Sequence, residues 1–169
     1  MNLEMKKETI GKVKIRQAKS DESEMVADIY ESEGSNKEAK VVKKVVEKEF
    51  QEILTGKRIV LFAEINKQPV GTTQLIFDSS NKEHADGKNI AHLHYLKVHK
   101  GFCKKGFGET LTLKVEEIAK QKGFKRMTVG VDEDNPYAKK LYEKWGYKLL
   151  QIEPGRTKKL KLFILYKDL

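Results

Sequence analysis

Two histidines and the glycine-rich turn that follows them are the residues of this chain whose types and spacing best suit chemistry. His92 and His94 lie two apart in an alternating apolar stretch, residues 91–98. This pattern predicts a β-strand that turns both imidazoles, with Leu96 and Val98, to one face. An imidazole, with an ordinary pKa of about 6.5, can take a proton from an ammonium group. The pair predicts a base; a hydrogen-bonded core histidine and a metal site without a visible third ligand are the alternatives.

The turn after this strand predicts an anion site. Gly106 and Gly108 let the backbone approach a bulky ligand, and the first N–H groups of the next helix have no partner inside it. Three lysines in the turn favour a polyanion such as a pyrophosphate: Lys100, Lys104 and Lys105. A nucleoside triphosphate loop is excluded because Phe107 and Gly108 follow Gly106, and a dinucleotide loop because its third glycine would be Leu111. A plain tight turn remains the alternative.

The elements that must position these residues can be read from hydrophobic periodicity. Strands are expected at residues 13–17, 59–65, 70–77, 91–98, 127–131, 147–152 and 159–166, the second and third forming a hairpin through residues 66–69. Helices are expected at about residues 21–30, at 38–54 with Val42, Val45, Val46, Phe50, Ile53 and Leu54 inward, after Gly106 with Phe107, Leu111, Val115 and Ile118 inward, and after Pro136 with Ala138, Leu141, Tyr142 and Trp145 inward. Gly71 indicates a bulge or close packing. The polar residues 78–89 predict a mobile loop in which His84 is exposed and without a role.

Two segments resemble the GNAT superfamily of acyl-CoA-dependent N-acyltransferases. Residues 103–108, Cys-Lys-Lys-Gly-Phe-Gly, are similar to its motif A, with Cys103 where Arg or Gln is usual. Residues 135–147 are similar to the Asn-x-x-Ala-x-x-Leu-Tyr-x-x-x-Gly-Phe/Tyr segment of the same family. The resemblance implies an α/β (α+β) GNAT-like fold: a central mixed, mostly antiparallel twisted sheet of six to seven strands flanked by about four helices.

The resemblance also implies roles for single residues, with acetyl-CoA as co-substrate and no metal. Tyr142 would be the general acid for the departing thiolate, although core packing is its plainer reading. Asn135 would hydrogen-bond the pantetheine arm, and His92 and His94 would be catalytic. The implied cofactor-binding residues are Leu96, Lys97, Val98, Cys103, Lys104, Lys105, Gly106, Phe107, Gly108, Glu109, Thr110, Asn135 and Ala138. Residues 91–108 are similar to the arylalkylamine N-acetyltransferase branch.

Length and composition narrow the function classes. The 169 residues fit a single domain, and the one cysteine, Cys103, excludes an intrachain disulfide. The net charge of +9 invites nucleic acid, but the lysines are scattered without a basic-aromatic pattern, so no nucleic-acid partner is expected. No stretch has the length of a membrane span, so no membrane partner and a cytoplasmic location are expected. Residues 20–34 carry only acidic charge, which indicates a solvated helix face or a rim that attracts a cationic amine.

The preferred hypothesis is an N-acetyltransferase that acts on a small primary amine by direct attack in a ternary complex. A protein N-terminal or lysine acetyltransferase and a non-catalytic CoA-binding module are the alternatives. The identity of the amine stays open, as does the choice between a monomer and a homodimer.

Overall fold

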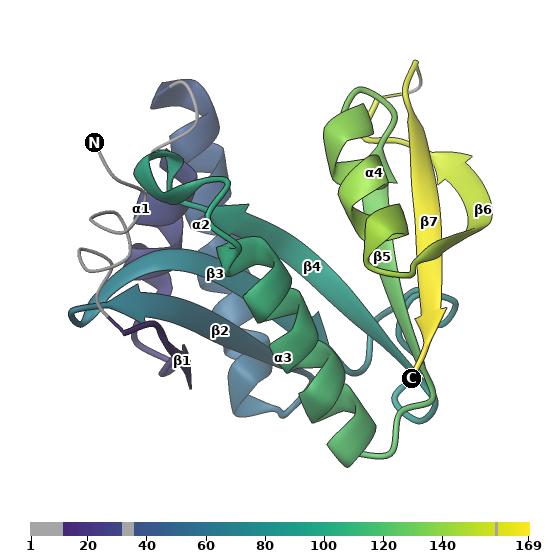
Figure 1. The fold of residues 1–169 in the computed structure, drawn as a ribbon, viewed down its shortest axis with the longest axis horizontal. Helices are drawn as coiled ribbons and strands as arrows, with labels where there is room; N and C mark the ends of the chain where they lie inside the picture. Colours follow the sequence, from purple (N-terminus) through teal and green to yellow (C-terminus); the bar gives the residue numbers. More distant parts are fainter. Residues whose placement is uncertain (1–11, 32–35, 158) are drawn as a thin grey trace, which may run out of the picture. The chain divides into compact units, whose positions relative to one another are not determined.

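The computed structural model describes residues 12–31, 36–157 and 159–169, and only the backbone of residue 31 and of residues 36–42. Within these ranges no helix is both long and apolar enough to cross a membrane. The elements are β1 (Lys14–Gln17), α1 (Ser23–Glu31), α2 (Asn36–Leu54), β2 (Arg58–Ile65), β3 (Gln68–Ile76), β4 (Ile90–Val98), the short 3₁₀ helix η1 (Lys100–Phe102), α3 (Phe107–Gln121), β5 (Arg126–Asp132), α4 (Pro136–Lys144), β6 (Lys148–Pro154) and β7 (Lys161–Asp168) (Figure 1).

The strands form one seven-stranded sheet in the order β1-β2-β3-β4-β5-β7-β6. β4 and β5 pair in parallel, whereas β1 with β2, β5 with β7 and β6 with β7 pair antiparallel. The predicted fold class, a mixed, mostly antiparallel sheet of six to seven strands with four helices, is confirmed. The chain divides into two compact units, residues 1–74 with 95–114 and residues 75–94 with 115–169, which are described separately below.

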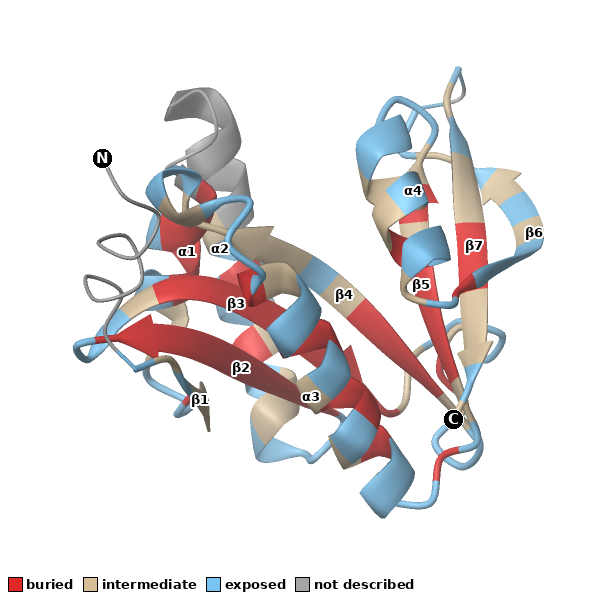
Figure 2. Ribbon diagram, in the orientation of Figure 1, coloured by how far each residue is buried: buried red, intermediate tan, exposed pale blue. Residues whose placement is uncertain are grey.

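The first unit has its core between α1, α2 and β2. Every residue of β2 is buried, which explains its almost continuous apolar run, and Figure 2 shows this strand in the colour of buried residues. The core cluster is Ala18, Val26, Ile29, Tyr30, Val46, Phe50, Val60 and Phe62, with Ile53 packed against it. The prediction that Val45 and Leu54 of α2 face inward is wrong, because Val45 is 37% exposed and Leu54 is 69% exposed. The side chain of Val42 lies outside the described residues.

Two boundaries in this unit have local backbone causes. Asn66 and Lys67 both have positive φ, 52° and 66°, as in a two-residue hairpin turn, so β3 begins at Gln68, two residues before the predicted start. Gly71 is explained by close packing: a Cβ there would lie 3.2 Å from Cδ1 of Leu111 and 3.3 Å from the carbonyl oxygen of Lys97. A larger residue would therefore push against α3 and β4.

The second unit is built on β5, which lies between β4 and β7. Met127, Val129 and Val131 are buried along it, as its alternation predicts. On α3 the buried stripe continues through Val115 to Ala119, whereas Ile118 is only half-buried. The closing antiparallel pair is confirmed, with a register irregularity between Leu149 and Gln151.

Residues 78–89 form a loop fixed by its own hydrogen bonds rather than the mobile spacer that its polarity predicts. The Oδ1 atom of Asp86 accepts the N–H groups of Lys88, Asn89 and Ile90 at 2.9, 2.7 and 2.8 Å. The exposed position predicted for His84 is also wrong. Its side chain is 17% exposed and its Nε2 lies 3.0 Å from Glu153, because the loop folds back toward β6.

Candidate functional site

The segment for which the glycines predict an anion site is a turn of unusual backbone shape in the first unit. Lys104 and Gly106 both have positive φ, 60° and 86°, and α3 begins at the next residue, Phe107. The N–H of Thr110 donates to the carbonyl of Gly106 at 3.0 Å, so the three amides before it have no carbonyl one turn back to bind. An added Cβ on Gly106 would meet no atom within 4 Å. The glycine thus borders open space at the positive end of the helix.

The side chains around this turn add charge without closing it. Cys103, Lys104, Lys105 and Glu109 are exposed, and Lys105 Nζ lies 3.5 Å from the carbonyl oxygen of Gly101. The Sγ atom of Cys103 is 3.6 Å from the carbonyl oxygens of Val98 and His99, so the thiol lies against the end of β4. All the predicted cofactor-binding residues from Leu96 to Thr110 lie in this unit, and Leu96, Lys97 and Val98 are half-buried.

β4 does not run evenly through the site. Tyr95 has φ 48°, which interrupts the extended backbone, and its carbonyl accepts the hydroxyl of Tyr30 at 3.2 Å. The prediction that Leu96 and Val98 share the face of His92 and His94 stays a prediction, because it assumes a strict alternation that Tyr95 interrupts. Tyr30 packs edge-to-face on Tyr95, with 5.5 Å between ring centroids. Burial raises the pKa of Tyr30 well above its ordinary value, so its hydroxyl stays protonated as a donor.

Sequence reasoning missed Tyr30 as a partner of the strand. Its helical spacing indicates only an inward residue, and nothing in the sequence marks an aromatic residue such as Tyr95 for positive φ, which non-glycine residues rarely adopt. The contact fixes the carbonyl direction at the break in β4.

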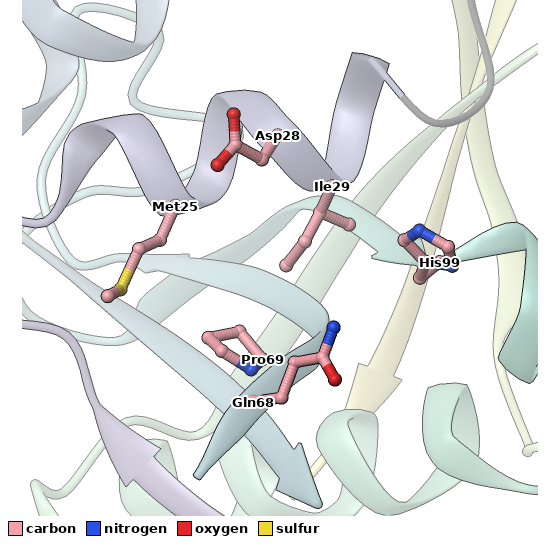
Figure 3. Close-up of a pocket in the computed structure, with 6 residues that line it drawn as sticks. All are labelled: Met25, Asp28, Ile29, Gln68, Pro69 and His99. Carbon is pink, nitrogen blue, oxygen red and sulfur yellow. The ribbon is translucent and has the colours of Figure 1, made fainter.

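A hollow of about 200 Å³ lies in the same unit (Figure 3). Its lining comes from α1, from the start of β3 and from the end of β4, and consists of Met25, Asp28, Ile29, Gln68, Pro69 and His99. Asp28 is the member of the acidic segment that lines it, whereas Glu22 pairs with Arg16 at 2.7 Å and Glu24 with Lys43 at 3.1 Å. Glu33 lies outside the described residues. A rim that attracts amines stays a prediction.

The second unit carries the predicted catalytic residues. His92 is 7% exposed, and its ring lies 5.8 Å from that of the half-buried His94, tilted by 39°. The shared face is therefore confirmed. His92 Nδ1 is 2.8 Å from Oγ1 of Thr128, its partner in the β4–β5 pairing. In the described part of the chain, no group of three or more His, Cys, Asp or Glu residues is arranged to hold a metal ion.

Tyr142 combines a buried ring with a reachable hydroxyl. The residue is 6% exposed and packs edge-to-face on Trp145 and Tyr147, each at 5.4 Å between centroids. Its hydroxyl has no protein partner among the described residues, where every fully buried side-chain N or O atom has one. The Tyr142 oxygen must therefore reach the surface. Burial raises the pKa of Tyr142 well above its ordinary value, so the group keeps its proton near neutral pH.

Asn135 begins the helix that carries Tyr142. Its side-chain oxygen accepts the N–H of Ala138 at 3.1 Å, and Pro136 follows in the first turn, as the sequence predicts. Because the oxygen of Asn135 holds the helix start, its amide NH₂ is the part that remains for a ligand. Tyr142 lies two turns further along α4.

Comparison with known proteins identifies a family that matches most of the chain. The model of the acetyltransferase (GNAT) family matches residues 24–147. Among curated proteins, none matches the chain.

Solved structures are similar in fold at low sequence identity. PaiA N-acetyltransferase from Thermoplasma acidophilum, in complex with coenzyme A, has a TM-score of 0.71 at 20% identity, over 94% of this chain and 99% of that one. An N-acetyltransferase from Staphylococcus aureus Mu50 has a TM-score of 0.73 at 17% identity, over 94% of this chain and 99% of that one. Ribosomal-protein-alanine N-acetyltransferase from Brucella melitensis has a TM-score of 0.74 at 19% identity, over 92% of this chain and 99% of that one.

Proposed function

Because the chain belongs to the GNAT acetyltransferase family, we propose that it is an N-acetyltransferase that moves the acetyl group of acetyl-CoA to a small primary amine, by direct attack in a ternary complex. The similarity of residues 91–108 to the arylalkylamine branch supports a catalytic role for His92 and His94 more firmly than it supports an aromatic amine as the substrate. The observation that carries the proposal is Tyr142, a buried tyrosine whose hydroxyl reaches the surface and has no partner among the described residues.

The turn before α3 fits the pyrophosphate of acetyl-CoA, which supplies the acetyl group as a thioester. The amides at the start of α3 would bind the phosphate oxygens, and the open space beside Gly106 would let them approach. Lys104 and Lys105 are exposed around the same turn and would add charge. Cys103 would replace only a side-chain contact of the family, which leaves the backbone amides available for the phosphates.

His92 and Tyr142 would handle the protons of the reaction. His92 would take one proton from the ammonium form of the acceptor, which leaves a neutral amine to attack the thioester carbonyl carbon. A C–N bond forms and the C–S bond breaks as Tyr142 gives its proton to the departing sulfur. The second nitrogen proton returns to the tyrosinate, and His92 releases its proton to water. The products are the amide, the free thiol and one proton.

An assay of thiol release tests this proposal. Purified protein with acetyl-CoA is offered arylalkylamines, polyamines, aminoglycosides and peptides with a free N-terminus. We expect turnover of at least one small amine, with the acetyl group on its nitrogen by mass spectrometry. Acetylation of the peptides alone would replace the small-amine proposal with a protein acetyltransferase.

Two variants test the roles of the side chains. Tyr142→Phe should lower kcat by about 100-fold, since general acid catalysis contributes at least this much, while the Kd for CoA is retained. Replacing His92 and His94 together by Gln should have the same signature. Unchanged kcat in both variants would contradict the mechanism but not the family.

A further inference from the structure

A hydrogen-bond chain in the second unit decides which nitrogen of His92 carries the proton. The Oγ1 atom of Thr128 lies 2.7 Å from the carbonyl oxygen of His84 and 2.8 Å from Nδ1 of His92, and 3.5 Å from the carbonyl oxygen of Ala91. A hydroxyl has one proton, and a carbonyl can only accept. In the 2.7 Å contact the Thr128 hydroxyl therefore donates its proton to the backbone carbonyl of His84. Thr128 Oγ1 must then accept a hydrogen bond from Nδ1–H of His92.

This assignment leaves the lone pair of neutral His92 on Nε2. When Nε2 takes a proton, Nδ1–H still donates to Thr128, so this hydrogen bond suits both the neutral and the charged ring. A base can then gain and lose its proton without rotating. Thr128 has 0% exposure, so water does not compete for its hydroxyl.

The ring plane of His92 has a second support in His84. The two imidazoles stack with 5.0 Å between centroids and 11° between planes. Nε2 of His84 lies 3.0 and 3.1 Å from the two carboxylate oxygens of Glu153, and the side-chain amide of Gln151 donates to the same carboxylate at 2.6 Å. His84 thus uses its carbonyl to orient Thr128 and its ring to cover His92.

We propose that Thr128 is a positioning residue: it holds His92 in the Nδ1–H tautomer, with Nε2 as the proton acceptor for the amine. The inference rests on the function proposed above and deepens it, because it assigns the base role to one nitrogen of one histidine. The loop at residues 78–89 then belongs to the site through His84. The sequence alone predicts no part in this chemistry for the hydroxyl-bearing residues of β5.

The tautomer can be measured without any substrate. In protein labelled with ¹⁵N-histidine, the nitrogen shifts and their couplings to ring protons distinguish Nδ1–H from Nε2–H, and the His92→Gln variant identifies the His92 signals. We expect Nδ1–H for neutral His92 in the wild type. Thr128→Ser keeps the hydroxyl and should keep this tautomer, whereas Thr128→Val has a similar shape without the hydroxyl and should lose it.

Kinetics then separate positioning from folding. Thr128→Val should lower kcat by about 10- to 100-fold, the loss typical when the hydrogen-bond partner that orients a metal-ligating histidine is removed, with KM for acetyl-CoA unchanged. Thr128→Ser should restore most of kcat. Melting temperatures of the two variants show whether any loss follows stability instead.

Three results would overturn the inference. They are an Nε2–H tautomer of His92 in the wild type, an unchanged tautomer in Thr128→Val, and a changed tautomer with unchanged kcat. The first two need no activity, so they are distinct from a failure of the proposed function, which would be wild-type protein that acetylates no amine. If the wild-type protein acetylates no amine, the catalytic role of Thr128 is removed along with the proposed function.

Discussion

Replacing Gly106 by alanine separates the binding role of the turn before α3 from its backbone strain. Gly106 has φ 86°, a region that costs a non-glycine residue about 1 kcal/mol or somewhat more. For a chain of this size the melting temperature should fall by about 2–4 °C. Since the new methyl group meets no protein atom within 4 Å, a larger effect on ligand binding must come from the ligand itself.

The expected loss of affinity follows from hydrogen bonds to phosphate. A hydrogen bond to a charged group contributes about 1.5–3 kcal/mol, and a methyl group in the open space beside Gly106 should displace at least one of them. The Kd for CoA should rise by about 10- to 100-fold, because every 1.4 kcal/mol or so is tenfold. Titration calorimetry with CoA measures this change directly.

Gly123→Ala is the matched control. Gly123 has φ 90° and an added Cβ there also meets nothing within 4 Å, but it lies just after the far end of α3. The two variants should lose similar stability, and only Gly106→Ala should lose CoA affinity. Wild-type affinity in Gly106→Ala would refute the anion site, and equal losses in both variants would show that strain alone explains the effect.

Further predictions concern groups in the second unit. Burial alone would raise the pKa of Asp86, but its backbone N–H donors together outweigh burial and lower it, so its charged form stabilises the fold above its ordinary pKa of about 4 and this stability is lost as the pH falls below it. Asp86→Asn should therefore melt about 2–4 °C lower at pH 7, with the gap closing toward pH 3 in a pH series of melting curves; a constant gap would contradict this reasoning. Glu116 is buried and accepts Tyr147 Oη at 2.8 Å and Lys167 Nζ at 2.7 Å, so Glu116→Ala should cost about 3 kcal/mol in urea unfolding, and a loss under about 1 kcal/mol would argue against a coupled network.

The sequence predicts the elements well because burial imposes a period on each of them. The stripe through Phe107, Leu111 and Val115 follows directly from this rule, whereas β2 is recognised by its almost continuous apolar run, because all of its residues are buried. The prediction of burial fails at single positions where the period allows more than one residue to face the core. After Val115 the buried position is Ala119, four residues on, and not the larger Ile118, three residues on, because a turn of 3.6 residues allows both spacings.

The candidate site was predictable where it depends on local sequence. The glycines before α3, the two-residue spacing of His92 and His94, and Asn135 at a helix start are all local patterns. Contacts between distant segments were not predictable. Thr128 and His84 are 44 residues apart, and their meeting depends on the parallel register of β4 and β5 and on the fold of a polar loop.

Each unit holds its own candidate residues by contacts within that unit, which has a consequence for variants. In the first, Gly71 leaves no room for a larger side chain against Leu111 and the carbonyl of Lys97. In the second, Thr128 and His84 fix the ring of His92. A change in one set leaves the other set's contacts in place. Coenzyme affinity and proton transfer should therefore be separable, with Gly106→Ala acting on Kd and Thr128→Val on kcat, and a variant that alters both would have to act through the stability of the chain.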